Sequence, residues 1–157
     1  MRKINLTRIS FGGASAIVTS TGLIIGFGAA AVSRSTIVAG LLIVGLADNV
    51  TDALSIHIYQ ESEKLVARAA FVATLSNFAT RIIISLSFVL LVVALPHTYA
   101  FFGSLAWGLS LLTGLTWLVA RDRGANVIPE VCKHLGVALL VILLSREIGV
   151  SILAYTH

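Results

Sequence analysis

Charged side chains are scarce in this sequence. Only 11% of its 157 residues are Asp, Glu, Lys or Arg, whereas 57% are hydrophobic. A typical soluble domain carries about 25% charged residues. A soluble domain of this size would need far more polar surface, so the composition excludes that class and predicts an integral membrane protein. The length corresponds to one domain. We therefore expect residues 1–157 to form a single transmembrane domain in contact with membrane lipid.

Cysteine and the usual catalytic motifs are also missing. The single Cys132 excludes a disulfide within the chain, and no Cys/His spacing resembles a zinc site. No nucleophile stands beside a base and no phosphate-binding loop is present, so we expect neither an enzyme nor a bound cofactor. An intramembrane aspartyl protease would need two aspartates on different helices that meet across a cleft.

The net charge of +4 raises the question of a nucleic-acid partner. The basic residues, however, punctuate apolar runs instead of clustering on one surface helix, which is how membrane topology is specified. We therefore expect no nucleic-acid partner.

Apolar runs long enough to cross a bilayer are what the sequence has in abundance. A span needs about 20 residues. The sequence predicts an all-α bundle of five transmembrane helices, at approximately 10–32, 35–59, 70–95, 99–120 and 129–155. The first run could instead be a signal peptide that ends in Ala29-Ala30-Ala31, but its length favours a span. It contains Gly22-x-x-x-Gly26, a spacing that lets helices approach closely in lipid.

The second span must include two aspartates. The apolar run from Thr36, for which Ser35 is the expected N-cap, ends at Ala47 and is too short to cross a bilayer. The helix must therefore continue through Asp48 and Asp52 to about Tyr59. This excludes a polar surface loop at these residues, and it argues against glycosylation at the sequon that starts at Asn49.

The distribution of basic residues predicts the orientation. Five spans place the two termini on opposite sides, and cytoplasmic segments carry an excess of Lys and Arg. With the N-terminus cytoplasmic and the C-terminus outside, only Arg34 and Arg146 of the eleven basic residues lie on the outer side. The cytoplasmic set is Arg2, Lys3, Arg8, Lys64, Arg68, Arg81, Arg121, Arg123 and Lys133.

The aspartates belong to a polar stripe on one face of the second helix. At about 100° per residue, Asp48, Asp52, Ser55 and Tyr59 share a narrow face. An ionisable group at membrane depth costs roughly 3 kcal/mol on insertion scales and is functional by default. Carboxylate and hydroxyl oxygens suit a hard divalent cation or protons. The stripe is therefore a candidate transport path, and Glu61 and Glu63 are candidates for its cytoplasmic entry.

A structural interpretation remains open beside this one. Asp48 and Asp52 could pair with an arginine from another helix, Arg81 or Arg146 for example, and only fix the packing. Arg81 either extends to the headgroups or faces a partner inside the bundle.

Three short motifs resemble the vacuolar iron transporter family and its bacterial relatives. The resemblance is best over residues 20–63. It rests on Thr21-Gly22-Leu23 with Phe27 and Gly28, on Gly45-Leu46-Ala47-Asp48, and on Ala53-x-Ser55 followed by Tyr59 and Ser62-Glu63.

The resemblance implies a homodimer of five-span chains that exports Fe²⁺ or Mn²⁺ from the cytosol in exchange for protons, through a path at the two-fold interface. Asp48 takes the place of the family's second-helix carboxylate. Thr21 stands where the family has an aspartate, so the resemblance adds Thr21 to the expected transport path. Ile56 stands where the family has a methionine that can bind metal. The chain passes from Glu63 almost directly into the third span, so the family's carboxylate-rich cytoplasmic helices have no counterpart.

We therefore expect a proton-coupled Fe²⁺/Mn²⁺ transporter in a prokaryotic inner membrane. The alternative is a non-transporting accessory subunit of a larger, hetero-oligomeric membrane complex that retains the transporter-like fold.

Overall fold

The computed structural model describes residues 6–62 and 67–156, and within them every regular element is an α-helix. Five of the described helices are long and apolar enough to cross a membrane, which confirms the predicted all-α class and the five predicted helices of spanning length. They are α1 (Leu6–Ala29), α2 (Arg34–Ser62), α3 (Ala67–Ala94), α4 (His97–Asp122) and α5 (Val127–Thr156).

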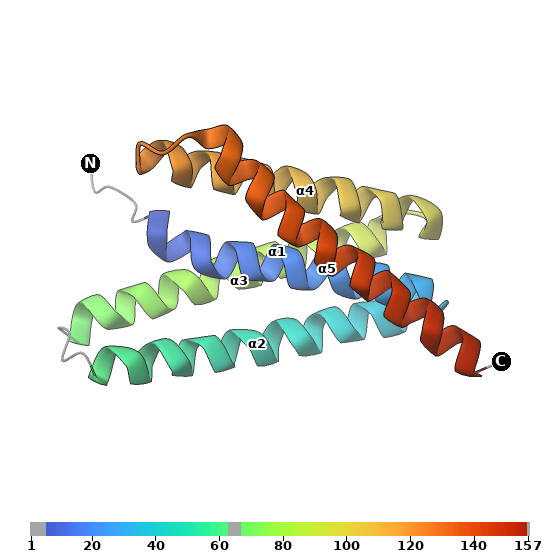
Figure 1. Cartoon of the computed structure of the whole chain (residues 1–157). Coiled ribbons are helices and arrows are strands. Elements are labelled where there is room, and N and C mark those ends of the chain that lie inside the picture. The colour runs from blue at the N-terminus through green and yellow to red at the C-terminus, as the bar shows by residue number, and fades with distance from the viewer. Residues whose placement is uncertain (1–5, 63–66, 157) are drawn as a thin grey trace.

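Successive helices run in opposite directions, so that α1 begins at one end of the bundle and α5 finishes at the other (Figure 1). We call the end where α2 finishes and α3 begins the α2–α3 end. The opposite end, where α1 is followed by α2, is the α1–α2 end. α4 is followed by α5 at the α2–α3 end.

α1 is the central helix and contacts each of the other four. Half of the residues in its apolar span are buried, against 11% in the span of α5. Glycines allow this close packing, because a Cβ at Gly149 of α5 would collide with the carbonyl oxygen of Gly26. A Cβ at Gly22 would lie 3.0 Å from Ser145 Oγ. The Gly22-x-x-x-Gly26 pair therefore serves a contact with α5 inside the same chain.

Two helices end in the same type of C-cap. At the end of α1, Ala31 has φ 54°, and its N–H donates to the Gly28 carbonyl at 3.1 Å while the Val32 N–H donates to the Phe27 carbonyl at 3.2 Å. This is the Schellman pattern, and it ends α1 at Ala29, before the expected boundary at residue 32. Gly124, with φ 67°, occupies the equivalent position after α4.

The second helix begins two residues earlier than the sequence suggests. Ser33, not Ser35, is its N-cap, because Ser33 Oγ accepts a hydrogen bond from the Thr36 N–H at 3.2 Å. Arg34 then donates to the Leu95 carbonyl at 2.8 Å, which ties the start of α2 to the end of α3. From there α2 continues without interruption past Asp48 and Asp52, as predicted.

The core changes character along the bundle. Toward the α1–α2 end, α1, α2 and α3 meet through a buried apolar cluster that includes Ile37, Leu41, Phe88 and Val92, with Leu23 packed against it. Toward the α2–α3 end, the residues that these helices bury against one another include Asn49, Asn77 and Arg81. This polar half contains the candidate site.

Candidate functional site

Three charged side chains meet between α2 and α3. Arg81 of α3 contacts both aspartates of α2: its Nη2 lies 3.4 Å from Asp48 Oδ2, and its Nη1 contacts Asp52 Oδ2 directly. Nη1 also lies 3.2 Å from Ser15 Oγ of α1 and donates to it. The Arg81 side chain is only 4% exposed. We refer to Asp48, Asp52 and Arg81 as the charged triad.

Helical geometry explains why both aspartates reach one guanidinium. Residues four apart lie one turn apart on the same face of a helix. Asp48 follows Arg34 by fourteen residues, or about 21 Å along the axis. It therefore lies near the middle of the 26-residue span Arg34–Tyr59. The triad is thus far from either end of α2.

Pairing with Arg81 is one of the two arrangements that the structural interpretation allowed. Arg81 faces partners inside the bundle and does not extend to the end of its helix. Arg146, the other candidate partner, instead contacts the neighbouring Glu147 at 2.6 Å on an exposed part of α5. The structure therefore identifies Arg81 as the counter-ion of the aspartates.

The charges of the triad do not balance. One guanidinium faces two carboxylates, so the three side chains carry a formal charge of −1 when all are ionised. Asp48 has the longer contact with Arg81, and its side chain is 41% exposed, against 28% for Asp52. A net charge inside a low-dielectric region is costly unless it is compensated. Asp48 is therefore the carboxylate with both the least satisfied charge and the easiest access.

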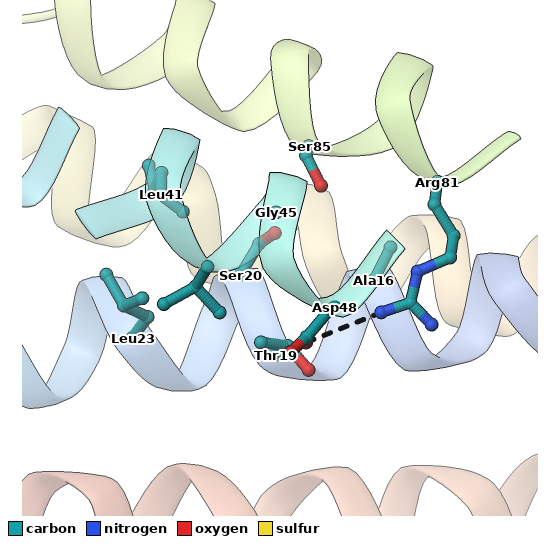
Figure 2. Close-up of a pocket in the computed structure, with 10 residues that line it drawn as sticks. Ala16, Thr19, Ser20, Leu23, Leu41, Gly45, Asp48, Arg81 and Ser85 are labelled. Carbon is teal, nitrogen blue, oxygen red and sulfur yellow. Dashed lines mark ion pairs between the residues drawn. The ribbon is translucent and has the colours of Figure 1, made fainter. Parts of the chain in front are cut away.

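A pocket of mixed polar and apolar lining adjoins Asp48. It lies between α1, α2 and α3, and it contains about 230 Å³ of empty space, including the space at its open mouth. Figure 2 shows Asp48 and Arg81 together at this pocket, with Thr19, Ser20 and Ser85 nearby. Its lining combines three hydroxyl groups, a carboxylate and a guanidinium with apolar side chains that include Leu23 and Leu41. Hydroxyl and carboxylate oxygens can bind a cation or relay a proton.

Two buried amides near the triad were missed by sequence reasoning. Asn77 of α3 is 2% exposed, and neither of its amide atoms has a hydrogen-bond partner. Asn49 of α2 is fully buried; its Nδ2 donates to the Phe78 carbonyl at 3.0 Å, and its Oδ1 has no partner. The signal was available, because Asn77, Arg81 and Ser85 are spaced by four residues and so share one face of α3.

The remaining predicted residues are not brought to the triad. Thr21 is 2% exposed and donates to the Ile17 carbonyl at 2.7 Å. It packs against Gly108 of α4, on a different side of α1 from Thr19 and Ser20. Ser55 and Tyr59 lie on exposed positions nearer the α2–α3 end. The Glu61 side chain and Glu63 lie outside the residues that the structure describes.

No metal-ligand cluster is present among the described residues: no three His, Cys, Asp or Glu side chains come together there. The triad supplies only two carboxylates, and the third group of the triad is the positively charged Arg81 side chain, which is not a metal ligand.

Comparison of the sequence with known protein families, with curated proteins and with solved structures finds no match.

Proposed function

We propose that this protein is a small cation transporter in which Asp48 binds the transported ion in exchange for a proton. The observation that carries the proposal is the formal charge of −1 on the triad, next to a pocket whose lining includes three hydroxyl groups. A buried ion pair contributes little net stability, since apolar residues of similar size often serve as well. Its retention in the middle of a span therefore favours a functional role over packing.

Arg81 acts in this proposal as an internal competitor of the ion. With Arg81 in contact with both aspartates, one proton on Asp48 neutralises the triad. A divalent cation that enters releases this proton as it binds Asp48, whose contact with Arg81 is the longer one, while Arg81 keeps its ion pair with Asp52. Fe²⁺ and Mn²⁺ are the cations we propose, supported by the resemblance of residues 20–63 to the vacuolar iron transporter family.

The assembly and membrane proposed are those that the resemblance implies: a homodimer in a prokaryotic inner membrane. Much of the chain's apolar surface is exposed, including Leu42, Ile43 and Leu46 on α2. Lipid or a second copy can cover this surface.

Flux measurements on purified protein in liposomes test the proposal. We expect wild-type protein to move Mn²⁺ or Fe²⁺ across the membrane with an opposite movement of protons, and Asp48→Asn to reduce both to the background of protein-free liposomes. Asp122→Asn is the matched control, because it removes one carboxylate from an exposed position at the end of α4. It should leave the flux unchanged. Folded wild-type protein that moves neither cation in either direction would reject the proposal.

The second candidate function is an accessory subunit of a larger membrane complex. It is favoured by one specific observation, that Arg81 engages both aspartates and so occupies the position between them. In this case the triad only aligns α2 and α3. The protein would then co-purify with unrelated membrane subunits, and Asp48→Asn would alter its stability but no flux.

A further inference from the structure

A polar seam lies inside a single chain, between the triad and the level of Thr74 on the side of the α2–α3 end. On α3, Thr74, Asn77, Arg81 and Ser85 fall within about 80° of one another at 100° per residue. Thr74 Oγ1 is buried without a partner, as are both amide atoms of Asn77. This face of α3 therefore presents a row of polar groups, of which Thr74 and Asn77 have side-chain atoms that the protein itself leaves unsatisfied.

The two helices that face this row, α1 and α2, carry small or polar residues at the same level. α1 contributes Gly12, where a Cβ would collide with Asn77 Oδ1, and Ser15, which accepts a hydrogen bond from Arg81. α2 contributes Asp52 and the fully buried Asn49. Buried polar groups in proteins nearly always have a partner, and ordered water is the usual one when no protein group is available. The unsatisfied atoms along the seam therefore call for water.

All three helices change from polar to apolar at one level. Beyond Ser85, the next residues on the same face of α3 are Phe88 and Val92, which are 0% and 2% exposed. On α2 the change falls between Gly45 and Leu41, and on α1 it falls between Ser20 and Leu23. Leu41 and Phe88 belong to one buried cluster, and Leu23 packs against that cluster. An apolar layer thus closes the seam toward the α1–α2 end.

We infer that the seam is a water-filled half-channel that leads protons and cations from the α2–α3 end to Asp48, and that Leu23, Leu41 and Phe88 form its closed gate. This inference rests on the proposed function, and it places the access route between α1, α2 and α3 of one chain. A route at an interface between two copies would leave the buried amides of the seam unexplained.

Cysteine accessibility tests the route without requiring transport. In a Cys132→Ser background, single cysteines replace Thr74, Asn77 or Ser85 in the seam, and Phe88 beyond it. Leu75→Cys and Leu86→Cys are the matched controls. They lie at similar depth on α3, but on the face that points away from the other helices, where lipid and not water would surround a cysteine. Each variant is treated in sealed vesicles with a membrane-impermeant methanethiosulfonate reagent, which modifies thiolates that water reaches.

We expect the three seam cysteines to be labelled from one side of the membrane only, whereas Phe88→Cys, Leu75→Cys and Leu86→Cys stay unlabelled. Phe88→Ala should in addition open the gate and raise proton leak through the protein at least tenfold. Size-exclusion profiles that match wild type identify the variants that fold.

The outcomes separate this inference from the proposed function. Labelling of the seam in a protein without cation flux supports the half-channel and rejects the transporter. Cation flux through a protein whose seam cysteines stay unlabelled overturns the half-channel and leaves the transporter in place. Equal labelling of Ser85→Cys and Phe88→Cys overturns the gate.

Discussion

At the scale of single residues, the stability of the molecule depends on Arg81, whose one guanidinium pairs with two carboxylates. Removing one partner from a buried ion pair is much more costly than removing the whole pair, because it leaves a buried charge uncompensated. Arg81 is the only cation that the described residues bring to Asp48 and Asp52 through an ion pair. Its loss would leave two adjacent negative charges without a counter-ion.

We therefore expect Arg81→Met to lower the free energy of unfolding by about 3 kcal/mol, the low end of the range for broken buried pairs. The low end applies because the Asp48 side chain is 41% exposed. The triple variant Arg81→Met, Asp48→Asn, Asp52→Asn should recover most of this loss. Thermal or SDS-induced unfolding in detergent, followed by circular dichroism, measures both. An Arg81→Met variant as stable as wild type would show that the aspartates do not need the guanidinium.

At the scale of helices, the two Schellman caps differ in one respect that can be tested. α1 ends with Ala31 in the left-handed region, whereas α4 ends with Gly124 in the same conformation. The left-handed conformation costs a residue with a Cβ roughly 1 kcal/mol, and glycine adopts it freely. The cap of α1 is therefore strained and the cap of α4 is not.

Opposite substitutions at these caps should have opposite effects. Ala31→Gly is expected to stabilise the protein by about 1 kcal/mol, and Gly124→Ala to destabilise it by a similar amount. No neighbouring atom lies within 4 Å of a Cβ at Gly124, so the second change tests conformation without a clash. Shifts in the midpoint of thermal unfolding report both changes. Shifts of the same sign for the two variants would contradict the assignment of the caps.

The helices themselves could be predicted from the sequence, but the sequence did not show which helices pack against one another. Run lengths and the bilayer thickness are enough to require five helices, and the short apolar run before Ala47 is enough to carry α2 past Asp48. Periodicity gives the face on which a residue lies, but it does not say which helix covers that face. For this reason the sequence could not decide whether Arg81 extends to the headgroups or faces a partner inside the bundle. The family resemblance likewise grouped Thr21 with Asp48, whereas Thr21 packs against Gly108 of α4.

The neutral amides were overlooked for a different physical reason. A charged residue within an apolar run draws attention because its insertion cost is high. Asn49 and Asn77 cost less to bury and do not interrupt an apolar run. Their importance follows only from complete burial and from amide atoms without partners, which are properties of the packed structure.

At the scale of the whole molecule, the order of the helices fixes which turns share a side of the membrane. Ser33 lies in the turn between α1 and α2, at the α1–α2 end, and Asn126 lies in the turn between α4 and α5, at the α2–α3 end. Arg121, in the last turn of α4, and Arg123 lie at the second turn, whereas only Arg34, the first residue of α2, lies at the first. The excess of basic residues should hold the α2–α3 end in the cytoplasm.

This orientation predicts how two exposed positions react in cells. In the Cys132→Ser background, Ser33→Cys should be labelled by an impermeant maleimide in intact cells, and Asn126→Cys only after the membrane is permeabilised. Both residues are exposed in turns. Ser33→Cys loses the N-cap hydrogen bond to the Thr36 N–H, at a cost of about 1 kcal/mol, but it removes no buried side chain from the bundle. The reverse pattern would place the α2–α3 end outside, and labelling of both residues in intact cells would exclude a single orientation. With the α2–α3 end in the cytoplasm, the proposed half-channel would open toward cytosolic cations, which is the direction that the proposed export requires.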